Sequence, residues 1–313
     1  MKALITGSEG FVGKYLRREL EAHGYAVTGL DRNPGKNVLD VDLRDAQAVA
    51  SAVAAVQPDA VVHLAGQANV ALSWAQPADT FEINTICALH LMDALRLHAP
   101  DARLLLVGSS DQYGNLGAAG QNVTEDISPQ PQTPYAISKQ AQEQLGLAYA
   151  RAYNLHICAA RAFNHVGAGQ RLGFIVPDFA AGIAGVELGQ RAQLTVGNLE
   201  TGRDFTHVRD VVRAYRLILE RGRMGTVYNV GSGTVHSVRE ILDALTAMAR
   251  RPIPVQVDPA RLRPSDTPVL RCNHDRLTLD TGWQPEIPLQ AALQEVLDEW
   301  RNKLRNRELS EDI

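Results

Sequence analysis

Apolar and polar positions follow two alternating periods along the first half of the chain. Short, almost continuous apolar runs occur at residues 2–6, 26–31, 60–65, 103–109 and 156–163. Between them lie stretches with apolar residues at helical spacing, at about 11–23, 45–56, 79–98 and 134–152. Continuous apolar strands are typical of parallel sheets that helices cover on both faces. The pattern therefore predicts an α/β protein with a doubly wound parallel sheet and right-handed crossovers.

The rhythm becomes less regular after residue 165. A glycine-rich, loop-like stretch comes first, and short strands are then predicted at 193–198, 203–208, 226–233 and 254–258. Helices are predicted at 208–222, about 237–250 and about 288–304. With 313 residues, the chain is long enough for one large two-lobed unit or for two small domains.

Charge and hydropathy exclude several classes of partner. The chain has 31 lysines and arginines against 35 acidic residues, a formal net charge of −4. This balance gives no basic surface for nucleic acid or for an anionic membrane. No apolar run is long enough to span a bilayer, and the first residues lack the pattern of a cleaved signal peptide. We therefore expect a cytoplasmic protein.

The cysteines and histidines do not predict a metal site or a disulfide framework. Cys87, Cys158 and Cys272 are far apart and odd in number, which favours free thiols in a reducing compartment. Three histidines within or beside predicted strands share no metal-ligand spacing and are interpreted as structural or substrate-lining: His63, His165 and His207. No metal is expected.

Three glycines lie between the first predicted strand and the first predicted helix. Gly7, Gly10 and Gly13 give a GxxGxxG spacing in "LITGSEGFVGKYL". Such a turn lets the backbone approach a pyrophosphate closely, and the helix that follows directs N–H groups at the phosphates. The alternative is a purely structural turn, but the strand–turn–helix context at the chain start favours a dinucleotide site.

The end of the second predicted strand bears on which dinucleotide binds. Asp31 ends the run "TGLD", where a carboxylate can accept hydrogen bonds from the adenosine ribose, which favours NAD(H). Arg32 follows at once and could hold the 2′-phosphate of NADP(H), so both cofactors remain open. Asp42 is either a contact of the adenine amine or a solvated loop carboxylate.

Tyr135 and Lys139 stand four residues apart at the start of a predicted helix. Thr133 can cap this helix, and Pro134 suits its first position. A separation of four places both side chains on one face, where an ammonium would lower the tyrosine pKa toward the working pH. The pair is either a proton-transfer device or an ordinary aromatic beside an ordinary surface lysine.

The strand "RLLLVGSSDQYG" ends in Ser109, at the edge of the sheet where open α/β folds bind ligands. The glycine turn, the strand-end serine and the YxxxK pair, in this order, resemble the extended short-chain dehydrogenase/reductase family over essentially the whole chain. The resemblance implies a catalytic set of Ser109, Tyr135 and Lys139. Asn84 matches the family's asparagine beside the cofactor, as a relay residue or as a structural one.

The resemblance also implies a domain division and a cofactor cleft. A Rossmann-like cofactor lobe would comprise residues 1–165 plus about 205–233. A smaller α/β carboxy-terminal lobe for the nucleotide sugar would comprise about 166–204 plus 234–313. Together with the glycines, Asp31, Arg32, Asp42, Asn84, Tyr135 and Lys139, the implied cofactor contacts are Phe11, Val12, Leu43, Leu64, Ala65 and Gly66. The family usually dimerises through the helices near 84–98 and 134–152, which implies a homodimer.

Motifs in the second half are similar to the GDP-mannose branch of this family. The run Ser109–Ser110–Asp111 and the loop "FNHVGAGQ" resemble GDP-4-keto-6-deoxy-D-mannose reductases, which form GDP-D-rhamnose. The 4,6-dehydratases of GDP-mannose usually carry Thr–Ser–Glu there. Dehydration needs a base at sugar C5, and Asp111 is one methylene shorter than glutamate, so reduction is expected and dehydration is the first alternative. Another nucleotide-sugar epimerase or reductase, or a cofactor-binding protein without turnover, is a less favoured alternative. Asp111 is otherwise a structural carboxylate.

A GDP moiety requires partners for a diphosphate, a ribose and a sugar. The resemblance implies Arg263 for the pyrophosphate and Asp266 for the ribose hydroxyls. Arg203 is a second pyrophosphate or sugar contact, and Asn164 is expected at the phosphate or sugar. Ser110 completes the implied substrate-binding set. Arg161, inside an apolar strand, is interpreted as one member of a structural ion pair.

Overall fold

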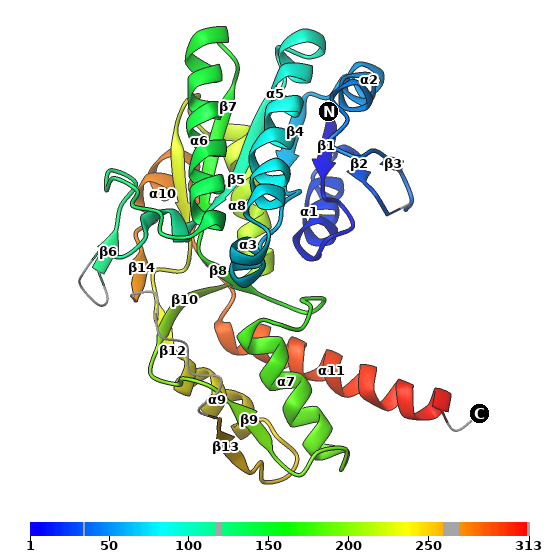
Figure 1. The fold of residues 1–313 in the computed structure, drawn as a ribbon, viewed down its shortest axis with the longest axis vertical. Coiled ribbons are helices and arrows are strands. Elements are labelled where there is room, and N and C mark those ends of the chain that lie inside the picture. The colour runs from blue at the N-terminus through cyan, green and yellow to red at the C-terminus, as the bar shows by residue number, and fades with distance from the viewer. Residues whose placement is uncertain (34, 117–120, 259–268, 312–313) are drawn as a thin grey trace.

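A computed structural model of the chain describes residues 1–33, 35–116, 121–258 and 269–311, arranged as two lobes (Figure 1). The larger lobe is built on a sheet of seven parallel strands in the order β11-β7-β5-β4-β1-β2-β3. The strands are β1 (Lys2–Thr6), β2 (Ala26–Asp31), β3 (Val38–Asp40), β4 (Ala60–His63), β5 (Arg103–Ser109), β7 (Ile157–Ala162) and β11 (Val227–Val230). This confirms the predicted doubly wound parallel sheet and adds β3, which the sequence pattern did not predict.

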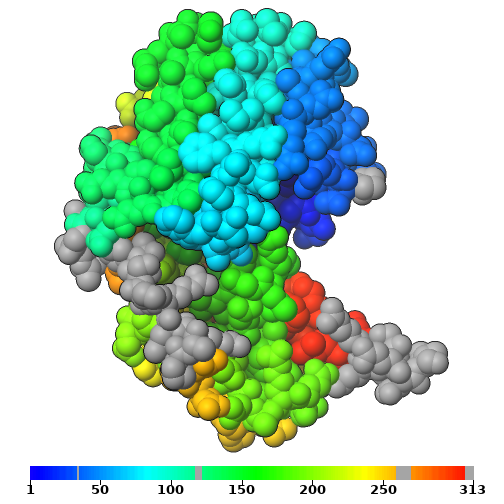
Figure 2. Space-filling view, in the orientation of Figure 1, coloured from blue at the N-terminus to red at the C-terminus, as the bar shows by residue number. Residues whose placement is uncertain are grey.

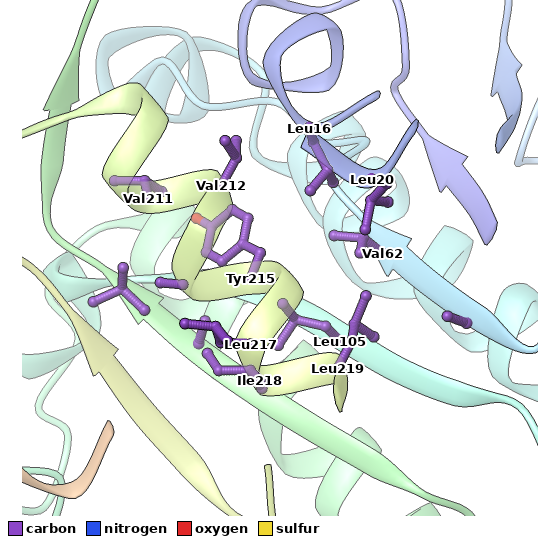
Figure 3. Packing of buried hydrophobic residues seen from close by; sticks show 14 of the residues in the cluster. Leu16, Leu20, Val62, Leu105, Val211, Val212, Tyr215, Leu217, Ile218 and Leu219 are labelled. Carbon is purple, nitrogen blue, oxygen red and sulfur yellow. The ribbon is translucent and has the colours of Figure 1, made fainter. Parts of the chain in front are cut away.

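Helices cover both faces of this sheet, because its strands are apolar on both sides. α1 (Phe11–Ala22) and α8 (Val208–Arg221) pack on one face. Figure 3 shows Tyr215 of α8 among leucines and valines of α1, β4 and β5. The opposite face carries α2 (Ala46–Val56), α5 (Cys87–His98) and α6 (Pro134–Tyr153). The order of the helices in the chain produces the two separate buried clusters of a doubly wound fold.

The predicted helix at 79–98 is not continuous. It consists of α4 (Pro77–Phe81), a π-helical turn η1 (Glu82–Ile86) and α5, and a short helix α3 (Val70–Ala75) precedes it. Asn84 lies in the π-helical turn, where its side chain bonds the backbone of Gln67 in the preceding loop. π-helical turns are rare and are frequent at functional sites.

The smaller lobe lies below the larger lobe in Figures 1 and 2. It has its own cluster of buried hydrophobic residues. Three helices supply most of it: α7 (Ile175–Glu187), α9 (Val238–Ala247) and α11 (Leu289–Glu311). The strand β9 (Leu194–Val196) adds Leu194 and Val196 to this cluster, and the exposed strand β13 (Val255–Val257) pairs with it in parallel. α7 was not predicted, since Pro177, Gly182 and Gly185 weaken the helical signal. A Cβ at Gly182 would lie 2.3 Å from Leu194 Cδ1, so this glycine allows α7 to pack on β9.

Short strands connect the two lobes. β8 (Asn164–Val166), β10 (Gly202–His207) and β12 (Val235–Ser237) form one sheet, and β6 (Gln121–Val123) pairs with β14 (Leu270–Cys272). The buried carboxylate of Asp204 in β10 accepts hydrogen bonds from Ser232, Gly233 and the Cys272 N–H at 2.6–2.9 Å. α10 (Asp275–Thr281) then returns to the larger lobe, where Leu277 is fully buried beside α8. The chain thus passes between the lobes several times.

Among the helices that the structure describes, none combines the length and the apolar character that crossing a membrane would require. The carboxyl ends of the sheet strands are directed toward the smaller lobe (Figure 1). The predicted site residues at the ends of β1, β2, β4 and β5 therefore lie at the edge between the two lobes.

Candidate active site at the carboxyl edge of the sheet

The glycine turn after β1 is packed so tightly that side chains would not fit. Gly7 has φ +70°, and a Cβ there would lie 2.9 Å from the backbone nitrogen of Ala65. A Cβ at Gly13 would lie 2.4 Å from the carbonyl oxygen of Gly7. Gly10 precedes the first turn of α1 as its N-cap without a side-chain capping bond. The turn therefore offers bare backbone and a helix N-terminus to a dinucleotide pyrophosphate, as this chemistry requires.

Asp31 connects the end of β2 to this turn. One carboxylate oxygen accepts the Glu9 N–H at 3.0 Å, and the other accepts the backbone and side-chain amides of Asn33 at 3.1 and 3.2 Å. Arg32 is exposed beside it. Asp42 is also exposed, and its carboxylate accepts the Arg44 N–H at 3.0 Å, which is a local turn bond. The structure thus places a carboxylate and an exposed arginine next to each other at the end of β2, beside the glycine turn.

The remaining predicted cofactor contacts lie on both sides of the turn. Phe11 stacks on His165 with ring centroids 6.2 Å apart, and Val12 is half-buried. Leu64 and Ala65 follow β4 and are half-buried, whereas Gly66 is exposed. A Cβ at Gly66 would lie 3.0 Å from Asn84 Oδ1 and 3.2 Å from Lys139 Nζ. The residues that end β4 therefore meet the predicted relay asparagine and the predicted lysine. Leu43 alone is buried, in the cluster beneath α2.

Ser109 and Tyr135 meet at the end of β5. Ser109 caps a 3₁₀ turn, η2 (Ser110–Tyr113), and its Oγ accepts the Asp111 N–H at 3.2 Å. The Ser109 hydroxyl also lies close enough to the Tyr135 phenol to stabilise its ionised form. Thr133 caps α6 and Pro134 begins it, as predicted. The structure thus brings together a hydroxyl donor and a phenol that could contact one substrate oxygen.

Lys139 lies one turn after Tyr135, with only 5% of its surface exposed. Its Nζ donates to the Val107 carbonyl at 2.9 Å and to Gln142 Oε1 at 3.3 Å. Burial lowers the pKa of Lys139 to about 8. Asn84 Nδ2 bonds the Ser138 hydroxyl at 2.9 Å, which anchors the π-helical turn to α6 directly beside the lysine.

The expected effect of Lys139 on Tyr135 was wrong for the protein without bound ligands. The Tyr135 pKa is raised, first by burial and then by the nearby Asp111 carboxylate, and the Ser109 hydroxyl opposes this only in part. The ammonium bonds a strand carbonyl and a glutamine amide. A phenol with a raised pKa keeps its proton, which suits an acid more than a base.

Asp111 lies beside this pair. Burial raises the pKa of Asp111, and the positive charge of Arg203 acts in the opposite direction. Arg203 in β10 and Asp111 at the end of β5 are therefore close enough to interact electrostatically, although they come from the two predicted lobes. The Arg203 guanidinium also donates to the Gly202 carbonyl at 2.7 Å.

The predicted substrate contacts are placed only in part. Ser110 is buried next to Asp111, and Asn164 is exposed in β8, paired with Phe205 of β10. Asn164 and Arg203 thus lie on neighbouring strands of the connecting sheet. Arg263 and Asp266 lie outside the described residues.

His63 and His207 are buried in the protein core, whereas His165 is half-buried. His63 is fully buried, its Nδ1 is 2.8 Å from Thr6 Oγ1, and burial lowers its pKa to about 3, so it stays neutral. His207 contacts Glu295 of α11 at 3.2 Å. In the part of the chain that is described, no group of three or more His, Cys, Asp or Glu side chains could hold a metal ion. Cys87, Cys158 and Cys272 are free and buried.

The sequence did not reveal the buried polar network behind Ser109. Arg161 in β7 forms the predicted ion pair, and its partner is Glu143 of α6 at 2.7 Å. Glu143 lies two helical turns after Tyr135, on the same face as Lys139. Gln112 connects this pair to Ser109. The spacing of Tyr135, Lys139 and Glu143 is the one signal that could have indicated Glu143.

The chain is similar over nearly its whole length to enzymes that act on GDP-mannose and its derivatives. A family model described as GDP-mannose 4,6 dehydratase matches residues 4–296. The chain is 35% identical to GDP-6-deoxy-D-mannose reductase of Pseudomonas aeruginosa over 305 residues, covering 97% of this chain and 98% of that protein. It is 28% identical to GDP-mannose 4,6 dehydratase 2 of Arabidopsis thaliana, with coverage of 95% and 86%.

Two solved structures have the same fold. The structure of RMD from Pseudomonas aeruginosa complexed with NADPH matches with a TM-score of 0.87 and 34% identity, covering 96% of this chain and 99% of that one. UDP-glucose 4-epimerase of Thermus thermophilus, in complex with NAD, matches with a TM-score of 0.86 and 29% identity, with the same coverage. On these grounds, and on the serine, tyrosine and lysine at the sheet edge, the chain belongs to the GDP-mannose 4,6 dehydratase family within the extended short-chain dehydrogenases/reductases.

Proposed function

We propose that this protein is an NAD(P)H-dependent reductase that converts GDP-4-keto-6-deoxy-D-mannose to GDP-D-rhamnose (GDP-6-deoxy-D-mannose). The observation that carries the proposal is the convergence of Ser109 and Tyr135 at the end of β5, where the serine hydroxyl acts on the phenol, beside buried Lys139. The relationship to GDP-6-deoxy-D-mannose reductase over nearly the whole chain supports the choice of substrate.

The glycine turn fits a dinucleotide, because Cβ atoms at Gly7 and Gly13 would collide with backbone. A bound nicotinamide cofactor supplies the hydride to sugar C4. Tyr135 then donates its proton to the developing alkoxide, which its raised pKa keeps available. Ser109 Oγ accepts the Asp111 N–H, so its own hydroxyl proton can be directed at the same oxygen. Lys139 orients the cofactor ribose and stabilises negative charge as the proton leaves.

In this proposal, each lobe binds a different ligand. Residues 1–165 plus about 205–233 hold the dinucleotide, and about 166–204 plus 234–313 hold the GDP-sugar. Within the described residues, Ser110, Asn164 and Arg203 are the substrate contacts. Asp31 favours NAD(H) through the ribose hydroxyls, whereas exposed Arg32 offers a guanidinium to NADP(H).

The test of this function is direct. Purified protein is mixed with GDP-4-keto-6-deoxy-D-mannose and with NADH or NADPH, and the loss of reduced nicotinamide absorbance is followed. NMR and mass spectrometry should identify GDP-6-deoxy-D-mannose as the product. The Tyr135→Phe protein is the control for oxidation unrelated to the site. No oxidation of either cofactor above that control would reject the proposal.

A second candidate reaction is supported by Asp111. A half-buried carboxyl with a raised pKa, close to Tyr135, could serve as the base that removes the proton at sugar C5 in a 4,6-dehydration. GDP-mannose supplied alone with catalytic NADP⁺ or NAD⁺ would then give the 4-keto product. Recovery of unchanged GDP-mannose would exclude dehydration and leave the reductase proposal intact.

We also propose a cytoplasmic homodimer. The outer faces of η1, α5 and α6 expose four large apolar side chains: Ile86, Leu97, Ile137 and Tyr153. Apolar residues on two adjacent helices suit a four-helix interface with a second copy. Sedimentation equilibrium checks this state, and a monomeric mass at micromolar concentration would reject it.

A further inference from the structure

A chain of buried polar groups runs from the backbone of Ser109 to β7. The Ser109 N–H donates to Gln112 Oε1 at 2.8 Å, and Gln112 Nε2 donates to Glu143 Oε2 at 2.9 Å. Glu143 receives two further hydrogen bonds from Arg161, at 2.7 and 2.9 Å. Gln112 is fully buried, Glu143 is 2% exposed and Arg161 is 4% exposed. The backbone of Ser109 is thus connected, through the Gln112 amide, to the buried Glu143–Arg161 ion pair.

The charge of Glu143 fixes the orientation of the Gln112 amide. Nε2 also donates to Gln140 Oε1 at 2.7 Å, so both acceptors around it are oxygens. A flipped amide would place Oε1 against the Glu143 carboxylate and Nε2 against the Ser109 N–H. Both contacts would be repulsive in a site without solvent. Oε1 must therefore face Ser109, and it holds the backbone from which the Ser109 hydroxyl projects.

The geometry leaves little freedom around this amide. Gly108 precedes Ser109, and a Cβ there would lie 2.3 Å from Gln112 Oε1. Tyr135 and Glu143 lie on the same helix, two turns apart, while Ser109 ends β5 and caps the 3₁₀ turn that contains Gln112. Gln112 is therefore the bridge between the loop that carries the serine and the helix that carries the tyrosine.

We propose that Gln112 is a positioning residue, which sets the Ser109 hydroxyl relative to the Tyr135 phenol through its bridge to the Glu143–Arg161 ion pair. This inference rests on the proposed function, because it assumes that Ser109 acts on the substrate oxygen. Gln112 itself has no contact with substrate in this role. Its removal should lower kcat and leave the KM for the cofactor unchanged.

A double-mutant cycle between Gln112 and Ser109 tests the proposal. Gln112→Met keeps the size of the side chain but removes all three of its hydrogen bonds, and kcat should fall about tenfold or more. Ser109→Ala should reduce kcat by roughly a hundredfold. If Gln112 acts through Ser109, the double variant should match Ser109→Ala within about threefold. Losses that multiply in the double variant would overturn the proposal, as would an unchanged kcat in Gln112→Met.

Two controls separate positioning from folding. Gln140→Ala removes the second acceptor of Gln112 Nε2 but leaves Glu143, so kcat should change by less than about twofold. Gln112→Asn keeps the amide but withdraws it from Ser109, and it replaces Gln112→Met if that protein does not fold. Melting temperature and NADPH affinity are measured for every variant. A wild-type protein without any reductase activity would reject the proposed function. If the wild-type protein is active but the kcat losses multiply in the double variant, only the role of Gln112 is rejected.

Discussion

The ammonium of Lys139 donates a hydrogen bond of 2.9 Å to the carbonyl oxygen of Val107, two residues before Ser109 in β5. This bond ties α6 to the strand whose end supplies the serine. It also accounts for how a lysine with 5% exposure is tolerated, since its Nζ has two acceptors. The charge is nevertheless costly, because burial lowers the pKa of Lys139 to about 8.

That pKa predicts how stability depends on pH. The folded protein releases the Lys139 proton near pH 8, while the unfolded chain keeps it to about 10.5. The cost of burying the charge is therefore complete below pH 8 and disappears as the pH rises toward 10.5. Lys139→Met removes the buried charge and should therefore raise the free energy of unfolding. This gain should be roughly 1 kcal/mol smaller at about pH 9 than at about pH 7. Urea denaturation of both free proteins measures this, and a gain that is constant or grows with pH would contradict it.

Tyr135→Phe should remove the acid and leave the binding sites in place. We expect kcat to fall by about a thousandfold, within the range that general acid catalysis contributes, with cofactor affinity changed by less than about threefold. Tyr215→Phe is the matched control, because the Tyr215 hydroxyl is buried without a hydrogen-bond partner. Stopped-flow reduction kinetics and cofactor fluorescence give the two readouts. Equal losses in both variants would contradict the role of Tyr135.

Two alanine substitutions in the glycine turn should separate stability from cofactor binding. A Cβ at Gly13 would lie 2.4 Å from Gly7 O, whereas a Cβ at Gly10 would lie 3.2 Å from the same atom. Gly13→Ala should therefore lower the free energy of unfolding by about 2 kcal/mol or more, and Gly10→Ala by less than about 1 kcal/mol. Both should weaken NAD(P)H binding, measured by titration calorimetry. Greater instability of Gly10→Ala would show that the packing is different.

The buried ion pair should matter far more for stability than an exposed one. Glu143→Gln leaves Arg161 without a countercharge in the protein interior, so the free energy of unfolding should fall by about 3 kcal/mol. Glu200→Gln makes the same chemical change in a pair with Arg239 in which both side chains are more than half exposed. Its effect should stay below about 0.5 kcal/mol. Guanidinium denaturation compares them, and similar losses would contradict the assignment.

Arg32 should discriminate between the two nicotinamide cofactors. Its guanidinium is exposed directly after Asp31, which is bonded to the glycine turn. Arg32→Ala should lower kcat/KM with NADPH by about tenfold, because the 2′-phosphate loses a charged partner, and should leave NADH almost unaffected. Arg18→Ala removes another exposed guanidinium from α1 as a control. An equal change with both cofactors would reject this role.

Much of the larger lobe was predictable, because its strands and helices have strong and different periods. β1, β2 and β5 begin and end where the apolar runs do. The smaller lobe was harder to predict, since its strands have only three residues and α7 contains proline and two glycines. These elements depend on packing against partners distant in the chain, which local propensity does not encode.

In the candidate site, too, some residues could be predicted from the sequence and others could not. The glycines, Ser109 and Tyr135 were predicted because each follows a recognisable strand or begins a helix. The acceptors of Lys139 and the bridge through Gln112 were not, because a strand carbonyl and a buried amide leave no motif in the sequence. The raised pKa of Tyr135 also depends on burial and on Asp111, which only the folded arrangement defines.

The repeated passage of the backbone between the lobes limits how this architecture can be divided. The edge strand β11 follows α7 and β9 of the smaller lobe, and α10 returns to the larger lobe before α11 leaves it again. No single cut in the gene would yield two fragments that each contain a finished hydrophobic core. Such fragments would have to fold together by complementation, and neither lobe could be transplanted as a contiguous cassette.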